Sequence, residues 1–289
     1  MSVDITRSAA GRAVRRAAVL GSPITHSLSP VLHGAAYQAL GLQGWHYDRI
    51  ECDEAGLPGL IEGMGPEWAG LSLTMPLKRV ALTVAGEVSP LARAVGAANT
   101  MVFPSAGPAG GSRAENTDVA GLVEALREAG LTRVEQPVIL GAGGTAQAAL
   151  AAVRELGHQS PAVLVRNLSR TAELRETAER LGMRPVISGA LFEEPLPAAD
   201  LVISTLPAGA ADPLSSTRWS PGATVLDVVY ASWPTPLARS ALAVGCPVAS
   251  GLAVLLHQAV AQVELMTGYR GPVAAMRTAL AAAVAARPS

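Results

Sequence analysis

The sequence predicts an α/β protein in which parallel strands alternate with helices. Short apolar runs of strand length alternate with stretches of helical character along the 289 residues. One apolar run is followed directly by a glycine-rich turn, GAGGTA at 141–146, and then by an Ala-rich helix. Apolar residues make up 49% of the chain and charged residues 16%, which suffices for the core of one large domain or two ordinary ones.

The N-terminal part of the chain is expected to begin with a loose tail of a dozen or so residues, followed by a buried strand, AAVLG at 17–21. Ser29 and Pro30 have the residue types of a helix N-cap and first turn, so we expect a helix from there to about Leu40, where Gly41 ends it. Further strands are predicted at 45–50, 70–74 and 99–103, a helix at about 54–63, and a surface hairpin tip at 104–112.

Strands and helices alternate more regularly in the C-terminal part of the chain. Residues 137–156 are predicted to form a strand, the glycine turn and a helix. Further strands are predicted at 161–167, 200–205 and 224–230, and further helices at 119–129, 171–182 and, in an Ala-rich stretch, 251–286. This alternation predicts a parallel sheet with helices on both faces.

Charge and composition exclude several classes of protein. The net charge is −1 and no basic block occurs, so neither nucleic acid nor an anionic membrane is expected as a partner. No apolar run is long enough for a secretory signal or a membrane span. The two cysteines, Cys52 and Cys246, fit free thiols in a reducing compartment, so we expect a cytoplasmic protein. The five histidines show no metal-ligand spacing, and no metal is predicted.

The stretch LTMPLKR at 73–79 contains Lys78, the only lysine among 22 lysines and arginines. A single lysine can survive by accident in a chain that otherwise uses arginine. The alternative is that the position needs a base that can release and regain a proton, which arginine cannot do near neutral pH. The surroundings of Lys78 decide between the two.

The glycine turn GAGGTA fits the dinucleotide-binding fingerprint, with Ala146 at the third small position. Gly141 allows the tight turn after the strand. Gly143 lets backbone N–H groups approach a pyrophosphate at the positive end of the helix. The alternative is an ordinary strand-to-helix turn, but the apolar strand before it and the helix after it favour a nucleotide.

The strand that follows ends in LVRNLSR and lacks the acidic residue that binds the ribose 2′-hydroxyl of NAD. Arg166, Asn167, Ser169 and Arg170 gather there instead. A guanidinium suits a 2′-phosphate because it forms charge-assisted, bidentate hydrogen bonds. The sequence therefore favours NADP over NAD, unless these arginines are only solvated loop residues.

Several stretches, each weak singly, occur together in a fixed order. They are SLSP at 27–30, GLSLTMPLK at 70–78, GAANT at 96–100, ENTD at 115–118, GAGGTA at 141–146, DVVY and TPL within 227–237, and GLAVLLHQA at 251–259. Together they resemble the motifs of the shikimate dehydrogenase family, and the resemblance runs from residue 17 to about residue 270.

The resemblance implies a two-lobed α/β enzyme with its active site in the cleft. Residues 1–117, joined by the returning C-terminal helices at 252–289, would form the substrate domain, and residues 118–251 a Rossmann-like NADP-binding domain. The implied reaction is reversible hydride transfer between NADPH and the ring ketone of 3-dehydroshikimate, which gives shikimate for chorismate and aromatic amino-acid biosynthesis. A monomer or a homodimer is expected.

The resemblance also implies roles for single residues. Lys78 would exchange a proton with the substrate, and Asp118 would face it across the substrate. Further implied substrate contacts are Ser27, Ser29, Thr74, Asn99, Tyr230 and Gln258. The implied cofactor contacts are Gly141, Ala142, Gly143, Gly144, Thr145, Ala146, Arg166, Asn167, Arg170, Thr205, Val228 and Gly251. Without the resemblance, Ser29 and Asp118 are typical helix N-caps, Thr74 and Asn99 typical strand-end residues, and Gln258 a solvated helix residue.

The chain departs from the family pattern at three points. Ser72 replaces an asparagine, RNLSR replaces an NRT motif, and STLP at 204–207 replaces NATP. Alternative functions remain open: an NAD-linked quinate/shikimate or aminoshikimate dehydrogenase, a methylenetetrahydrofolate dehydrogenase, and a non-catalytic nucleotide-binding sensor. Ser-x-Ser and N-T-D oppose the folate enzyme, and the presence of both Lys78 and Asp118 opposes the sensor.

Overall fold

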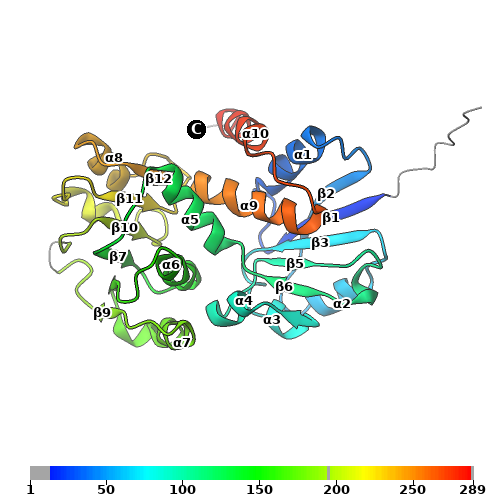
Figure 1. Cartoon of the computed structure of the whole chain (residues 1–289), viewed down its shortest axis with the longest axis horizontal. Helices are drawn as coiled ribbons and strands as arrows, with labels where there is room; N and C mark the ends of the chain where they lie inside the picture. The colour runs from blue at the N-terminus through cyan, green and yellow to red at the C-terminus, as the bar shows by residue number, and fades with distance from the viewer. Residues whose placement is uncertain (1–13, 194–195, 288–289) are drawn as a thin grey trace, which may run out of the picture.

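The computed structural model describes residues 14–193 and 196–287, so the predicted N-terminal tail lies outside the described residues. The chain forms two lobes, each built on a six-stranded sheet with helices packed against it (Figure 1). The predicted α/β fold class is confirmed. Within the described part of the chain, no helix combines the length and the apolar character needed to cross a bilayer.

The first lobe contains a mixed sheet. Its strands are β1 (Arg15–Gly21), β2 (Trp45–Glu51), β3 (Trp68–Leu73), β4 (Glu87–Val88), β5 (Thr100–Val102) and β6 (Arg113–Glu115). Its helices are α1 (Ser29–Ala39), α2 (Leu57–Glu62), α3 (Ala81–Val84), α4 (Pro90–Val95) and the 3₁₀ helix η1 (Pro108–Gly110). The strand order is β2-β1-β3-β5-β6-β4; β1 runs parallel to β2 and β3, and β5 antiparallel to β3 and β6. The predicted hairpin tip joins β5 to β6.

The start of α1 differs from the prediction. Leu28 is the N-cap and Ser29 is already the first helical residue, so the predicted N-cap at Ser29 is wrong. Pro30 lies in the first turn, as its missing N–H favours. The hydroxyl of Ser29 makes no capping hydrogen bond to α1, so it is available to other partners.

The second lobe contains the predicted parallel sheet. Its strands are β7 (Pro137–Leu140), β8 (Ala162–Leu164), β9 (Val186–Ser188), β10 (Leu201–Ser204), β11 (Thr224–Asp227) and β12 (Val248–Ser250). Its helices are α5 (Asp118–Glu128), α6 (Gly144–Glu155), α7 (Ala172–Leu181), α8 (Pro236–Ala243), η2 (Leu168–Arg170) and η3 (Asp212–Ser216). The order β12-β11-β10-β7-β8-β9 changes direction between β7 and β10. Ligands of such sheets bind at the carboxyl ends of the strands beside this switch point.

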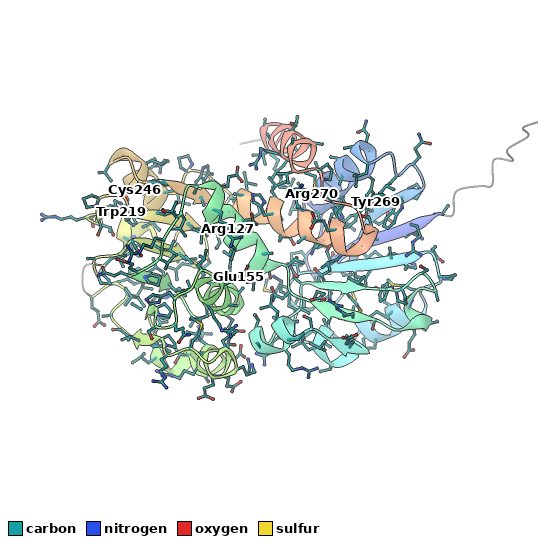
Figure 2. All side chains as sticks on the ribbon, in the orientation of Figure 1. Arg127, Glu155, Trp219, Cys246, Tyr269 and Arg270 are labelled. Carbon is teal, nitrogen blue, oxygen red and sulfur yellow. The ribbon has the colours of Figure 1, made fainter. Side chains whose placement is uncertain are left out.

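The outermost strands β9 and β12 and the helix α8 were not predicted. Each of the two strands has only three residues, too few for a recognisable apolar pattern. Near β12 and α8, Cys246 and the partly buried Trp219 pack in a small apolar cluster with Val225 and Ala241 (Figure 2). Cys52 and Cys246 are both free and buried.

The C-terminal stretch 251–286, predicted to be helical, forms two helices, α9 (Gly251–Thr267) and α10 (Val273–Ala285). Gly268 ends α9 in the left-handed conformation with φ 75°, and Pro272 precedes α10. α9 leaves β12 of the second lobe and runs to the first lobe, where α10 packs against α1 (Figure 1). The core there joins Leu32 of α1, Leu256 of α9 and Leu280 of α10.

His33 of α1 is fully buried in this core. Its ring stacks on Tyr47 with 3.9 Å between ring centroids, and its Nε2 lies 3.3 Å from Oε1 of Gln262. Burial lowers the pKa of His33 to about 3, because the charged imidazolium would lose its hydration; the Gln262 contact opposes this only in part. The folded protein therefore keeps His33 neutral where the unfolded chain takes up a proton.

We expect this histidine to make the protein acid-sensitive. The stabilising contribution is complete above pH 6.5, where both states are neutral, and declines as the pH falls towards 3. The free energy of unfolding should lose about 2 kcal/mol between pH 7.5 and pH 5 through this residue. Urea titrations at several pH values measure the free energy of unfolding. It should decline less with falling pH in His33→Phe, which keeps an aromatic ring stacked on Tyr47. Equal declines in the variant and the parent would contradict this expectation.

Candidate active site

A cavity of about 430 Å³ lies where the two lobes meet. Its wall in the first lobe combines the loop before α1 with the end of β3 and the segments on either side of β5 and β6. All predicted substrate contacts from this part of the chain line it: Ser27, Ser29, Thr74, Lys78, Asn99 and Asp118. Tyr230, from the loop after β11, and Gln258, from α9, also line it. The structure thus brings together side chains from six separate motifs.

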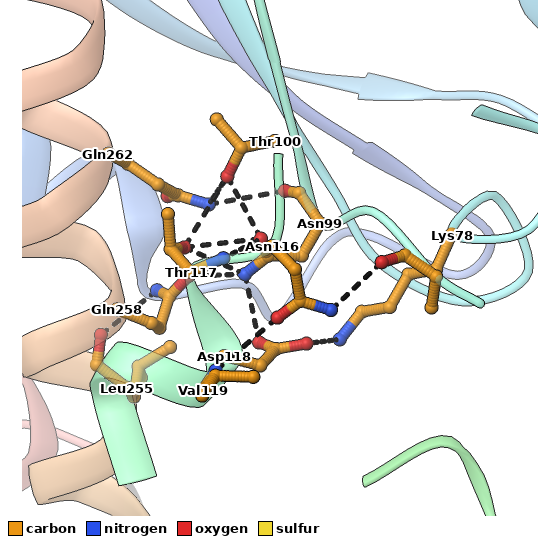
Figure 3. A network of polar contacts seen from close by, with 11 residues as sticks. Lys78, Asn99, Thr100, Asn116, Thr117, Asp118, Val119, Leu255, Gln258 and Gln262 are labelled. Carbon is orange, nitrogen blue, oxygen red and sulfur yellow. Dashed lines mark hydrogen bonds and ion pairs between the residues drawn. The ribbon is translucent and has the colours of Figure 1, made fainter. Parts of the chain in front are cut away.

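Lys78 and Asp118 form an ion pair in this cavity, with Nζ 2.6 Å from Oδ2 (Figure 3). Lys78 follows β3 after a short turn, and Asp118 is the first residue of α5. The N-cap of α5 is Thr117, so Asp118 does not cap the helix, and its side chain is directed at the lysine instead. The positive end of α5 favours a carboxylate at this position. The pair is partly exposed, at 33% for Lys78 and 22% for Asp118, so both side chains are accessible from the cavity.

Asn99 holds Asp118 in place. It is 2% exposed and lies just before β5. Its Nδ2 donates to Oδ1 of Asp118 at 2.9 Å and lies 3.3 Å from Oε1 of Gln258 (Figure 3). Its Oδ1 accepts from the backbone N–H of Thr117 at 2.7 Å and from the hydroxyl of Thr100 at 3.0 Å. Because these bonds fix the amide, one oxygen of Asp118 is oriented by Asn99 and the other is left to Lys78.

Ser72 occupies one of the three positions where the sequence departs from the family pattern. Its hydroxyl accepts from the hydroxyl of Tyr47 at 2.6 Å and donates to Oε1 of Gln262 at 2.7 Å. Ser29 is a further hydrogen-bond partner of Tyr47, whose pKa is raised by burial. Gln262 in turn donates to the hydroxyl of Thr100 at 3.0 Å, beside Asn99. This chain of bonds ties the serine end of the cavity to the Asn99 end.

Sequence reasoning missed Tyr47 and Gln262. Gln262 lies four residues after Gln258 and therefore on the same face of α9, which was the available signal. Tyr47 lies in the predicted strand of the first lobe, and no sequence motif marks it.

The glycine turn borders a second cavity, of about 860 Å³. Gly141 ends β7 with φ 107°, and a Cβ there would lie 2.6 Å from the Thr205 hydroxyl, so the turn requires glycine. Gly143 is the N-cap of α6, no side chain caps this helix, and the space beside Gly143 and Gly144 is open. Free N–H groups at an open helix N-terminus bind phosphate. The turn therefore fits a dinucleotide pyrophosphate.

The predicted cofactor residues are divided between the two cavities. The second cavity is lined by Gly141, Ala142, Gly143, Arg166, Asn167, Arg170 and Thr205. The first cavity is lined by Thr145, Val228 and Gly251, close to Lys78. Gly144 begins α6, but Ala146 is buried in the core and lines neither cavity. The division indicates that one extended ligand can reach from the arginines to Lys78.

Arg166 and Arg170 lie in the loop and 3₁₀ helix after β8, and both are exposed. Neither guanidinium has an ion-pair partner among the residues that the structure describes. Asn167 Oδ1 accepts from the backbone N–H and the hydroxyl of Ser169, at 2.9 Å and 2.8 Å, which closes the loop between the two arginines. The loop thus presents two free cations to the second cavity.

Asp227 supports the loop that carries Val228 and Tyr230. It is 1% exposed, and it accepts from the Thr235 hydroxyl at 2.7 Å and from the Val229 N–H at 3.2 Å. Burial raises the pKa of this carboxyl, and the two hydrogen bonds oppose the shift. The two bonds hold both ends of the loop.

Among the described residues, no group of three or more His, Cys, Asp or Glu side chains is arranged to hold a metal ion. The polar side chains of the first cavity carry hydroxyls, amides, one ammonium, one carboxylate and the imidazole of His26. Such a set can bind a small polyhydroxylated acid and exchange a proton with it.

Comparison with known proteins agrees with this geometry. The family described as "Shikimate dehydrogenase substrate binding domain" matches residues 19–101, and "Shikimate 5'-dehydrogenase C-terminal domain" matches residues 251–281. The chain is 34% identical over 283 residues to the shikimate dehydrogenase (NADP(+)) of Desulfitobacterium hafniense, covering 94% of this chain and 99% of the relative.

Two solved structures are similar along most of their length. The shikimate dehydrogenase of Mycobacterium tuberculosis has 43% identity and a TM-score of 0.81, over 93% of this chain and 99% of that one. The shikimate 5-dehydrogenase of Thermus thermophilus, in complex with NADP(H) and shikimate, has 32% identity and a TM-score of 0.80, over 93% of this chain and 100% of that one. With more than 30% identity along the whole length of such relatives, the chain belongs to the shikimate dehydrogenase family.

Proposed function

We propose that this protein is an NADP-dependent oxidoreductase that interconverts 3-dehydroshikimate and shikimate, a step towards chorismate and the aromatic amino acids. The observation that carries the proposal is the Lys78–Asp118 pair, 2.6 Å apart, in a polar cavity that adjoins an open glycine turn. The pair supplies a proton-exchanging group, and the turn supplies a site for the cofactor pyrophosphate.

The substrate is a small ring with one carboxylate and several hydroxyls, and the cavity offers different groups at its two ends. Ser27 and Ser29 can donate hydroxyl hydrogen bonds to the carboxylate. Thr74 and Tyr230 add hydroxyls on the cavity wall. Lys78 and Asp118 are then left for the reacting part of the ring. We assign the carboxylate to the serine end and the reacting carbon to the lysine end.

Bound across both cavities, NADPH would supply the hydride for the ring ketone. As the ketone oxygen gains negative charge, the ammonium of Lys78 donates a hydrogen bond and then its proton to it. In the reverse direction, the amine of Lys78 accepts the hydroxyl proton. Asp118, fixed by Asn99, holds the lysine ammonium and a neighbouring substrate hydroxyl in position. The cofactor contacts are those assigned above, with Arg166 and Arg170 at the 2′-phosphate.

In this proposal one lobe binds the substrate and the other binds the cofactor. Residues 1–117 with 252–289 form the substrate domain, and residues 118–251 form the NADP domain; the two six-stranded sheets and the return of α9 and α10 support this division. The two free cysteines favour a reducing compartment, so we propose a cytoplasmic enzyme, acting as a monomer or a homodimer.

A spectrophotometric assay of the purified protein tests the function. We expect NADPH to form when shikimate and NADP are supplied together, and more slowly with NAD or with quinate in place of shikimate. Faster turnover with quinate and NAD would indicate a quinate dehydrogenase. Turnover only with methylenetetrahydrofolate, or none at all despite NADP binding, would contradict the proposal in favour of a folate enzyme or a sensor.

Removing the hydroxyl of Ser27 should weaken shikimate binding without affecting NADP. The backbone carbonyl of Ser27 accepts from Arg49 Nη2 at 2.7 Å, so the loop keeps its anchor in Ser27→Ala. A lost hydrogen bond to a carboxylate costs about 1.5–3 kcal/mol, or about 10- to 150-fold in the dissociation constant. Calorimetric titration of shikimate measures it. The matched control is Ser22→Ala, whose hydroxyl bonds Glu51 away from the cavity and should leave the affinity unchanged. Equal affinity of Ser27→Ala and the parent would exclude this carboxylate site.

A further inference from the structure

Glu173 introduces a negative charge into the groove that holds two arginines. It lies in the first turn of α7 and lines the second cavity together with Arg166 and Arg170. A carboxylate is favourable at a helix N-terminus. In a groove assigned to a 2′-phosphate, however, an unpaired carboxylate repels the ligand.

The charge of Glu173 is paired with a cation from the other lobe. Arg79, the residue directly after Lys78, makes an ion pair through Nη1 with Oε1 of Glu173. Oε2 of Glu173 accepts from Nε2 of Gln147, on α6, at 3.2 Å. Glu173 also lines a third cavity together with Arg79 and Gln147, so this residue borders both that cavity and the cofactor groove.

We propose that Arg79 is a specificity-determining residue: by pairing with Glu173, it allows the groove to accept the 2′-phosphate and so favours NADP over NAD. This inference rests on the proposed function, which assigns the 2′-phosphate to Arg166 and Arg170. A phosphate group carries between one and two negative charges near neutral pH, whereas the 2′-hydroxyl of NAD carries none. An unpaired Glu173 therefore weakens the binding of NADP but not that of NAD.

The size of the effect follows from Coulomb's law. Charges at the protein surface interact at an effective dielectric constant of about 20 or more, so we expect an effect of about 5- to 30-fold in binding. Arg79 and Glu173 are 62% and 56% exposed, so the lower part of this range applies and added salt reduces it. The same exposure means that replacing either side chain leaves the core intact.

Steady-state kinetics with both cofactors tests the inference. The quantity measured is the ratio of kcat/KM for NADP to kcat/KM for NAD at saturating shikimate. In Arg79→Ala we expect this ratio to fall about 5- to 10-fold at low salt, chiefly through the KM for NADP. The fall should shrink as the ionic strength is raised. Glu173→Gln alone should not lower the ratio, and in Arg79→Ala/Glu173→Gln the ratio should return to within about threefold of the parent.

The matched control is Arg127→Ala. Arg127, on α5 (Figure 2), is 52% exposed and is ion-paired with Glu124. It does not line the cofactor groove. The variant loses the same charge and a similar ion pair, and its ratio should equal that of the parent.

Other outcomes would overturn the inference. An equal loss with NADP and NAD in Arg79→Ala would show that the ion pair only holds the lobes together. A lowered ratio that Glu173→Gln does not restore, or an unchanged ratio, would exclude charge pairing as the cause. A parent enzyme that prefers NAD would overturn the cofactor assignment itself, and this inference with it, before any variant is made.

Discussion

Replacing Lys78 by arginine should reduce turnover about 10²- to 10⁴-fold, the usual contribution of a positioned acid–base group. The variant keeps the positive charge beside Asp118, so electrostatic attraction for the substrate is largely retained. Arginine cannot release a proton near neutral pH, and its planar guanidinium is larger than an ammonium. If proton transfer is the function of Lys78, charge alone does not replace it.

Stopped-flow or steady-state assays with shikimate and NADP measure the loss, and calorimetric titrations show whether binding is retained. Lys78→Ala should be similarly impaired in turnover, with shikimate affinity changed much less. A thermal melt close to that of the parent shows that neither variant is unfolded. If Lys78→Arg turns over within a few-fold of the parent, the lysine is only an electrostatic contact, and its uniqueness in the sequence is an accident of composition.

Replacing both Arg166 and Arg170 by alanine should raise the KM for NADP and leave the KM for NAD nearly unchanged. Both arginines are exposed in the cofactor groove without a carboxylate partner in the described part of the chain. Losing charge-assisted hydrogen bonds to the 2′-phosphate should cost about 1.5–3 kcal/mol, or about 10- to 150-fold in affinity.

The same assay with each cofactor measures this effect. Arg154→Ala is the matched control, because Arg154 is an exposed arginine of α6 in the same lobe that does not line the groove. Its NADP preference should match that of the parent. An unchanged NADP/NAD ratio in Arg166→Ala/Arg170→Ala would remove the 2′-phosphate from this loop. This result also distinguishes the two proposals. If only the Arg79 inference is wrong, Arg166→Ala/Arg170→Ala still loses affinity for NADP.

Local sequence patterns were sufficient where a residue's role depends on its chain neighbours. The glycine turn needs Gly141 because a side chain there would collide with Thr205, and that requirement is visible as a motif. The helices that begin near Ser29 and Asp118 were predicted from their first residues. Both were expected as possible N-caps, however, and in both helices the N-cap is the preceding residue. Cap positions differ by a single residue, and only the backbone conformation distinguishes them.

The C-terminal helices show what composition leaves open. An Ala-rich stretch favours helix throughout, so 251–286 was predicted to be helical, with no boundary placed inside it. A single left-handed residue, Gly268, divides it into α9 and α10, and the division lets α10 fold back onto α1. The edge strands β9 and β12 are too short for a periodic pattern, and they exist because neighbouring strands pair with them.

The sequence by itself determined the α/β class, the order of its motifs, the glycine turn and the identity of Lys78 and Asp118 as candidates. Only the tertiary structure decided that Lys78 and Asp118 are in contact, that Asn99 orients the carboxylate, and that Tyr47 and Gln262 support Ser72. It also decided that Arg79 meets Glu173. Backbone propensities and turn chemistry act between near neighbours, so one sequence displays them. A hydrogen bond between residues far apart in the chain depends on how sheets and helices pack, and no local pattern records it.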